Sequence, residues 1–382
     1  MWHVIEAVEG TRNWSVMADL ESEMILLDQK GIELVLVVRG VPDWAQTDSG
    51  HVCGPIAQSK FTDFASFMGE LVSLYSKPPY NVRYWEIGNE PDFLYSDREI
   101  PFGCWGDEND PYYGGGYYGE MLNLIYPKIK AADPDAQVIV GGLLLDCDPR
   151  NPPAGKDCKS SKFLEGILRS GAGSAFDGVS FHSYDYYNGD IGSYSNLNWL
   201  GSSSTTGPIL DQKADYLYSV LLQYNHEDKY LINTENALLC NHYPCDDKFE
   251  MTKAIYAAQS YAESLVHKVS PSIWYSFTGS WQSTRLVSGS SIPLPAYFAF
   301  RAAGEILRDM SFTQQIAIDG LTAYEFSGRG DRKWILWATD GYTHQITLPG
   351  LPLYMWDLMG SPVSPQSSIN IGLEPVYLEW ED

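Results

Sequence analysis

The sequence is short of several features that would assign it to common classes. It has no apolar run near the ~18 residues that a membrane-spanning helix needs. Basic residues are few, with 25 Lys and Arg against 49 Asp and Glu, so the net charge is −24. That balance disfavours nucleic acid and anionic membrane surfaces as partners. What remains is a chain of 382 residues, 44% of them apolar, which is enough for a large buried core.

Signals for nucleotide binding and for secretion are also missing. A glycine-rich phosphate loop would follow an early strand, whereas GGGYYGE at 114–120 follows no predicted strand and is interpreted as a loop. We therefore expect no cofactor. The first residues, MWHVIEAVEG, contain no charged segment of the kind that opens a secretory signal.

Six cysteines, an even number, are the main indication of cellular location. Two pairs lie close in sequence, in LDCDPRNPPAGKDC and LLCNHYPC, as disulfide partners often do. Disulfides imply an oxidising compartment, so we expect a secreted, cell-surface or periplasmic protein. Cys240, His242 and Cys245 could instead bind a metal, but a fourth ligand is not evident and we expect no metal site.

Strand-like and helix-like segments alternate over the first 308 residues. The strands are continuous apolar runs, as expected where both faces of a parallel sheet are buried. The predicted strands are 1–8, 32–40, 82–89, 137–145, 176–184, 229–238 and 272–279, and the helices between and after them are 18–31, 61–75, 117–133, 161–171, 210–224, 251–268 and 296–310. This rhythm favours an α/β fold, a (β/α)₈ TIM barrel, over a doubly wound open sheet. Seven βα units are visible, so we interpret the barrel as lacking its first unit through N-terminal truncation.

After residue 308 the pattern changes to short alternating segments separated by Gly, Asp and Pro. No helix is predicted there. The change favours a small C-terminal antiparallel β-sandwich. We therefore predict a catalytic barrel over 1–308 and a sandwich domain over 309–382.

Polar and aromatic residues gather at the carboxyl ends of the predicted strands, where barrels of this type place their chemistry. In YWEIGNEPDF, Gly88 and Pro91 argue against a helix, so Glu90 is expected just after a strand and Glu86 as a buried support residue, paired with Arg39 or Arg83. A second carboxylate, Glu235, lies at a later strand end, with His182 and Tyr184 as candidate donors. The candidate site residues are Arg39, Trp44, Asn89, Glu90, His182, Tyr184, Glu235, Trp274 and Trp281.

Several motifs resemble the clan A retaining glycoside hydrolases, most of all family 39, with family 5 also near. They are W-H-V-I-E at 2–6, P-D-W-A at 42–45, W-E-I-G-N-E-P at 85–91, F-H-S-Y at 181–184, I-N-T-E-N at 232–236 and D-L-M-G-S-P-V at 357–363. The resemblance covers most of the chain, and the Asn-Glu-Pro motif is its most specific part. It departs at Arg39, where relatives often have histidine.

The resemblance implies a role for each matching residue. Glu90 resembles the acid/base and Glu235 the nucleophile, and Asn89 resembles the residue that contacts the sugar 2-hydroxyl. His182 and Tyr184 resemble the pair near the nucleophile and the substrate. Trp274 or Trp281 would then form the aromatic floor under the sugar, and Arg39 and Trp44 would lie at the same rim.

The cysteines fall in predicted loops on that rim. We favour Cys147–Cys158 and Cys240–Cys245, which leaves Cys53–Cys104, out of 15 possible connectivities.

Two functions are consistent with these patterns. The first is a retaining glycosidase that acts on a plant- or microbe-derived oligosaccharide or polysaccharide through a glycosyl-enzyme. The second is a non-catalytic carbohydrate-binding barrel, which would not need two carboxylates. Either way the expected partner is a carbohydrate.

Overall fold

The computed structural model describes residues 1–48, 50–94, 103–199 and 207–381. These residues divide into two compact units, one of Met1–His182 with Tyr216–Ile232 and one of Ser183–Asp215 with Asn233–Asp382. Two strands, β4 (Gly178–Tyr187) and β6 (Tyr230–Leu239), each begin in the first unit and end in the second. The predicted boundary between residues 308 and 309 falls inside the second unit and remains a prediction.

The main sheet has the strand order β1-β2-β3-β4-β6-β7, with β5 attached to β4. Its first four strands pair in parallel. Besides β4 and β6, its strands are β1 (Val35–Val38), β2 (Tyr84–Asn89), β3 (Gln137–Leu143), β5 (Tyr194–Ser195) and β7 (Val269–Trp274). The helices of this region are α1 (Trp2–Ile5), α2 (Ala18–Gln29), α3 (Phe61–Tyr75), α4 (Gly115–Ala132), α5 (Phe163–Arg169), α6 (Leu210–Gln223), α7 (Asp247–Val266) and α8 (Pro295–Ile306). The alternation confirms the predicted α/β barrel class.

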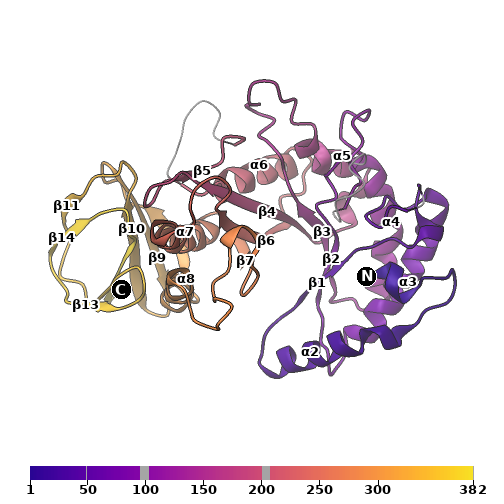
Figure 1. Ribbon diagram of the computed structural model, residues 1–382, viewed down its shortest axis with the longest axis horizontal. Coiled ribbons are helices and arrows are strands. Elements are labelled where there is room, and N and C mark those ends of the chain that lie inside the picture. Colours follow the sequence, from indigo (N-terminus) through magenta and orange to yellow (C-terminus); the bar gives the residue numbers. More distant parts are fainter. Residues whose placement is uncertain (49, 95–102, 200–206, 382) are drawn as a thin grey trace. The chain divides into compact units, whose positions relative to one another are not determined.

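Antiparallel sheets follow α8, as predicted. One has the order β13-β12-β15-β10-β9-β8 and the other pairs β11 with β14, near the yellow end of the chain in Figure 1. Their bounds are β8 (Ser311–Gln315), β9 (Leu321–Gly328), β10 (Asp331–Ala338), β11 (His344–Thr347), β12 (Tyr354–Trp356), β13 (Pro362–Val363), β14 (Ser368–Ile371) and β15 (Val376–Glu381). Their apolar side chains form two clusters. One of these clusters also includes Ala303, near the end of α8, and Leu307, the residue that directly follows this helix.

The first predicted strand is wrong. MWHVIEAV has the apolar run of a strand, but Trp2–Ile5 form the short helix α1. The backbone N–H groups of Trp2 and His3 donate to Arg39 and Gly40 carbonyls, so this segment is held by the chain just after β1. The prediction that 114–120 forms a loop is also wrong, since α4 begins within this stretch at Gly115.

Local sequence explains the helices well. In α3 the buried residues include Phe64, Phe67, Met68 and Leu71, which recur at the spacing of one helix face. The longer α7 begins where the Asp246 carboxylate accepts hydrogen bonds from the N–H groups of Lys248 and Phe249. Among the described residues, no helix is long and apolar enough to cross a membrane.

All six cysteines are paired. The disulfides are Cys53–Cys104, Cys147–Cys158 and Cys240–Cys245, with Cα–Cα distances of 5.4, 5.3 and 6.1 Å. These are the pairs that we favoured. The Cys240–Cys245 bond leaves neither sulfur as the thiolate that a metal site would need.

The second unit also buries three carboxyl groups in one neighbourhood. Burial raises the pKa of Asp185 to about 7, of Asp211 to about 6 and of Glu263 to about 8. Asp185 accepts a hydrogen bond from the Ile209 N–H (3.0 Å), and Glu263 accepts one from the Tyr324 hydroxyl (2.8 Å). Beside them, His267 lies 3.0 Å from the Asp215 carboxylate and 3.6 Å from that of Glu263. The folded chain therefore holds protons that the unfolded chain, with carboxyl pKa values near 4, releases.

This cluster predicts that stability falls as pH rises. Below about pH 4 the carboxyls are protonated in both states and contribute nothing. Between about pH 4 and 8 the unfolded state binds fewer protons, so the free energy of unfolding decreases with pH. Glu263→Gln, which stays neutral and still accepts from Tyr324, should show a smaller decrease in urea midpoint between pH 5 and 8. Glu374→Gln, at an exposed position, is the matched control and should follow the parent. Equal pH slopes in all three proteins would contradict the prediction.

Candidate functional site

The first candidate carboxylate, Glu90, directly follows β2. Gly88 and Glu90 both have positive φ, 91° and 50°, so the backbone turns sharply out of the strand at this point. A non-glycine residue in the left-handed region is uncommon and is retained only where its surroundings hold it. Here the Glu90 N–H donates to the Gly142 carbonyl of β3 at 2.8 Å. The turn directs Glu90 into a buried environment, with 6% of the residue exposed.

A histidine of β4 binds the Glu90 carboxylate. His182 Nδ1 lies 2.8 Å from Glu90 Oε1, and His182 itself is buried. This contact joins His182 to Glu90, and the predicted role of His182 as a donor for Glu235 stays a prediction. In the folded chain a histidine and a carboxylate that share a hydrogen bond form a unit able to hold and move a proton.

Glu86 lies on β2, four residues before Glu90, and is also buried. Its Oε1 accepts hydrogen bonds from the Gly142 N–H (2.6 Å) and the Ser180 hydroxyl (2.7 Å). The predicted support role fits this position. These two contacts come from β3 and β4, and the pairing with Arg39 or Arg83 stays a prediction.

Room for His182 depends on a glycine of β3. A Cβ on Gly142 would lie 2.1 Å from His182 Nε2 and 2.9 Å from Glu86 Oε1. Those distances are far below van der Waals contact. Gly142 therefore lets the imidazole and the Glu86 carboxylate lie against the backbone of β3.

The second candidate carboxylate, Glu235, lies on β6 and belongs to the second unit. Its Oε2 accepts a hydrogen bond from the Tyr184 hydroxyl of β4. Trp281, in the short 3₁₀ helix η6 (Trp281–Ser283), meets the Tyr184 ring edge to face at 5.4 Å. Tyr275 lies against both, with ring centroids 6.4 Å from Tyr184 and 5.6 Å from Trp281. Glu235 is thus accompanied by three aromatic rings, of which the sequence named two.

A buried polar network lies on the strand beside Glu235. The Asn236 amide donates to Ser260 (3.0 Å) and accepts from the hydroxyls of Ser183 (3.2 Å) and Tyr256 (2.9 Å). Asn233 also donates to Ser183, at 2.6 Å. Sequence reasoning missed this network, although the two asparagines that flank Glu235 in INTEN were its signal. These hydrogen bonds fix β6 against β4 and α7.

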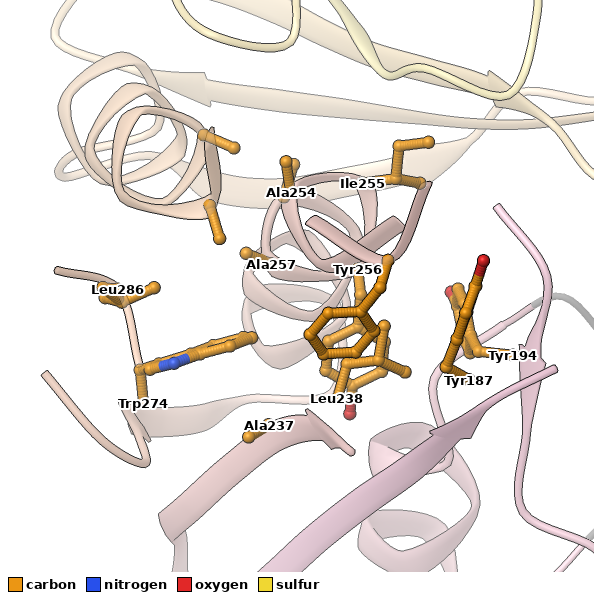
Figure 2. Packing of buried hydrophobic residues seen from close by; sticks show 14 of the residues in the cluster. Tyr187, Tyr194, Ala237, Leu238, Ala254, Ile255, Tyr256, Ala257, Trp274 and Leu286 are labelled. Atoms are coloured by element: carbon orange, nitrogen blue, oxygen red, sulfur yellow. The ribbon is translucent and has the colours of Figure 1, made fainter. Parts of the chain in front are cut away.

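The two candidate tryptophans differ in environment. Trp274 is buried, its indole N–H donates to the Thr284 carbonyl (2.8 Å), and it packs among Ala257, Leu286 and their neighbours (Figure 2). Trp281 is 46% exposed. Of the two, Trp281 has the ring face available to a ligand.

The remaining candidates lie in the first unit. Arg39 and Asn89 border a mostly apolar cavity of about 250 Å³, together with Trp2, Phe64, Ile87 and Trp105. The Trp44 indole donates to the Glu6 carbonyl (2.9 Å) and packs edge to face on Trp2 at 5.3 Å. Trp44 therefore anchors its loop to α1, which is the packing role expected of such a residue.

No protein-family model matches the chain, and no curated protein matches it. A family 39 glycoside hydrolase from the gut symbiont Bacteroides cellulosilyticus WH2 matches with a TM-score of 0.73 and 18% identity, over 99% of this chain and 73% of that chain. A GH30 endoxylanase from Clostridium papyrosolvens C71 matches with a TM-score of 0.63 and 12% identity, and a monomeric beta-xylosidase from Caulobacter crescentus CB15 with 0.61 and 13%. Each of these two alignments covers 97% of this chain and 85% of the other. At such identities the likeness shows a shared fold.

The Gly142 contacts generate a prediction about stability. Gly142→Ala inserts a methyl group where the His182 ring lies, so it should lower the free energy of unfolding by about 1–3 kcal/mol, the usual cost of overpacking. Guanidinium unfolding followed by circular dichroism measures the change. Gly350→Ala, where a Cβ meets no atom within 4 Å, is the control and should change stability by less than about 0.5 kcal/mol. An equal effect of the two substitutions would show that Gly142 is not sterically required.

Proposed function

We propose that this protein is a retaining glycoside hydrolase. It cleaves the glycosidic bonds of a plant- or microbe-derived oligosaccharide or polysaccharide by double displacement. The observation that carries the proposal is that each of two carboxylates from different strands is bound by a side chain of β4, Glu90 by His182 and Glu235 by Tyr184. The fold shared with glycoside hydrolases is consistent with it.

In this proposal Glu90 is the general acid and then the general base. It first protonates the oxygen of the leaving group as the glycosidic bond breaks, and later takes a proton from the water that hydrolyses the intermediate. His182, hydrogen-bonded to Glu90, orients the carboxyl group and responds to its change of charge. Burial of Glu90 keeps competing water from this exchange.

Glu235 is the nucleophile in the same scheme. Its carboxylate attacks the anomeric carbon as the leaving group departs, which forms a glycosyl ester, and the second displacement releases the sugar with retained configuration. The Tyr184 hydroxyl bonds Glu235 Oε2 and holds the carboxylate for attack. Asn89, just before Glu90, contacts the 2-hydroxyl of the reacting sugar, and Trp281 supplies the aromatic floor.

The proposed location is outside the cytoplasm. Three disulfides, each joining loop segments, are stable in an oxidising compartment. Pentose substrates are the first to test, since the matched structures include an endoxylanase and a beta-xylosidase.

The roles of the two glutamates can be distinguished by the hydrolysis rates of their variants on substrates with good and poor leaving groups. Glu90→Gln should slow hydrolysis of poor leaving groups by roughly 10²–10⁴-fold, the usual contribution of general acid catalysis, and should affect the first displacement on nitrophenyl glycosides far less. Glu235→Gly should abolish turnover, and added azide should restore cleavage with a glycosyl azide of inverted configuration as product. Steady-state rates on aryl xylosides, arabinosides, glucosides and uronides, with product configuration by NMR, provide the readout.

The exposed Glu374→Gln is the control for both variants and should retain parental rates. Full activity of Glu235→Gly would remove Glu235 from the nucleophile role. A parent chain that binds these sugars without hydrolysing any of them would instead support a carbohydrate-binding barrel.

Trp281 should contribute to binding more than to chemistry. A sugar face stacked on its ring is lost in Trp281→Ala, so KM should rise up to about tenfold while kcat changes little, in line with ~1.4 kcal/mol for a good aromatic contact. Tyr342→Ala removes another exposed ring of the second unit and should leave both constants unchanged. A fall in kcat with constant KM would contradict the floor assignment.

A further inference from the structure

We propose a second saccharide-binding site, in the second unit, on the groove between α8 and the six-stranded antiparallel sheet. We call it the α8 groove. It is bordered by Phe298, Arg301 and Glu305 of α8 and by Lys333, Trp356 and Glu379 of the sheet, and one part of it encloses about 210 Å³. None of these residues belongs to the set around Glu235. The inferred ligand is a neutral pyranose chain, which the groove holds without cleaving it.

One side of the α8 groove is a single face of α8. Phe298, Arg301, Ala302 and Glu305 are spaced by three, four and seven residues, so they lie in line along the helix. This face extends about 10 Å, at 1.5 Å per residue. The Arg301 guanidinium lies over the Phe298 ring at 5.7 Å, and Arg301 Nε is 4.0 Å from Glu305 Oε1. Phe298 and both charged side chains are partly exposed, so the face is open to a ligand.

The turn after β12 approaches α8 closely and divides the hollow into two connected parts. Gly360 has φ 79°, and a Cβ there would lie 2.9 Å from the Ala302 Cβ. Both parts are bordered by Arg301, Met359 and Gly360. The absence of a side chain at Gly360 therefore lets this turn lie directly against Ala302 of α8, between the two hollows.

On the sheet side Trp356 borders the groove, and Tyr354 stacks on Trp356 just beside that lining. Tyr354 and Trp356 lie two residues apart on β12, so both side chains point to the same face of the sheet. Their rings are 5.6 Å apart and only 26° from parallel, and Tyr354 is 57% exposed. Flat exposed rings suit the apolar C–H faces of pyranose sugars, since they combine a large contact area with few rotatable bonds.

Charge distribution favours a neutral ligand. Lys333 and Glu379 form an ion pair of 2.9 Å in the groove, with side chains 14% and 12% exposed, and Lys333 Nζ also donates to the Ile306 carbonyl at 2.9 Å. With Arg301 and Glu305 the groove thus carries two cations and two anions. Sugar hydroxyls both donate and accept hydrogen bonds, so they match cationic and anionic partners alike. A polyuronate would have to approach Glu305, Glu379 and a chain of net charge −24.

Affinity electrophoresis of the full chain tests the proposal. The gels contain wheat arabinoxylan, barley β-glucan, galactomannan or polygalacturonate, and every protein carries Glu235→Gln so that hydrolysis does not alter the gel. We expect retardation by at least one neutral polymer. Tyr354→Ala should weaken that retardation about tenfold, and so should Arg301→Ala. Tyr342→Ala, which removes a ring that is 74% exposed elsewhere in the second unit, should migrate like its parent.

The outcomes separate this site from the proposed catalytic one. In the active background, Tyr354→Ala should hydrolyse a small aryl glycoside at the parental rate, because that substrate does not reach the α8 groove. Unchanged retardation in both Tyr354→Ala and Arg301→Ala would overturn the proposal. So would retardation by polygalacturonate alone, or by no polymer. Retardation in the gels, together with a parent chain without Glu235→Gln that hydrolyses none of the glycosides, would support the groove while rejecting the glycosidase proposal.

Discussion

A buried carboxylate is tolerated only where hydrogen-bond donors replace the water it has lost, and in this protein β4 supplies one such partner to each of three glutamates. Ser180, His182 and Tyr184 alternate along β4 and so point to one face of it. They bind Glu86, Glu90 and Glu235 in turn. Each of the three carboxylates therefore depends on the register of β4 for one of its partners. A shift of one residue would turn all three donors to the opposite face.

The rest of the main sheet accommodates this arrangement. The Gly142 backbone accepts from Glu90 and donates to Glu86, and its missing side chain leaves space for the His182 ring. On β6, the amides of Asn233 and Asn236 link that strand to Ser183 of β4. These contacts hold neighbouring strands in register, so the hydrogen bonds that position the carboxylates and those that stabilise the sheet form one system.

The proposed catalytic residues and the proposed saccharide-binding groove differ in their physical environment. At Glu90 and Glu235 the structure holds one buried and one half-buried carboxylate against side chains of β4. In the α8 groove it combines exposed rings with balanced charges, which suits recognition and offers no carboxylate pair held by donors from one strand. A polymer held at such a groove would remain near the protein after each dissociation from a catalytic site, which raises its effective concentration.

The chain's local patterns were sufficient to predict the α-helices from α2 onward, the main strands after the first segment, the antiparallel C-terminal region and the pairs Cys147–Cys158 and Cys240–Cys245. Each of these depends on periodicity, capping residues or spacing along the sequence. MWHVIEAV was misread because an apolar run is compatible with a strand or a helix, and contacts with Arg39 and Gly40 decide between them. Sequence could name Glu90, His182, Tyr184 and Glu235 from the predicted strands, although β4 and β6 continue past the predicted ends to Tyr187 and Leu239. Only the tertiary structure decided that His182 binds Glu90, that Trp274 is buried while Trp281 is exposed, and that Gly142 must lack a side chain, because these depend on distances between segments far apart in the chain.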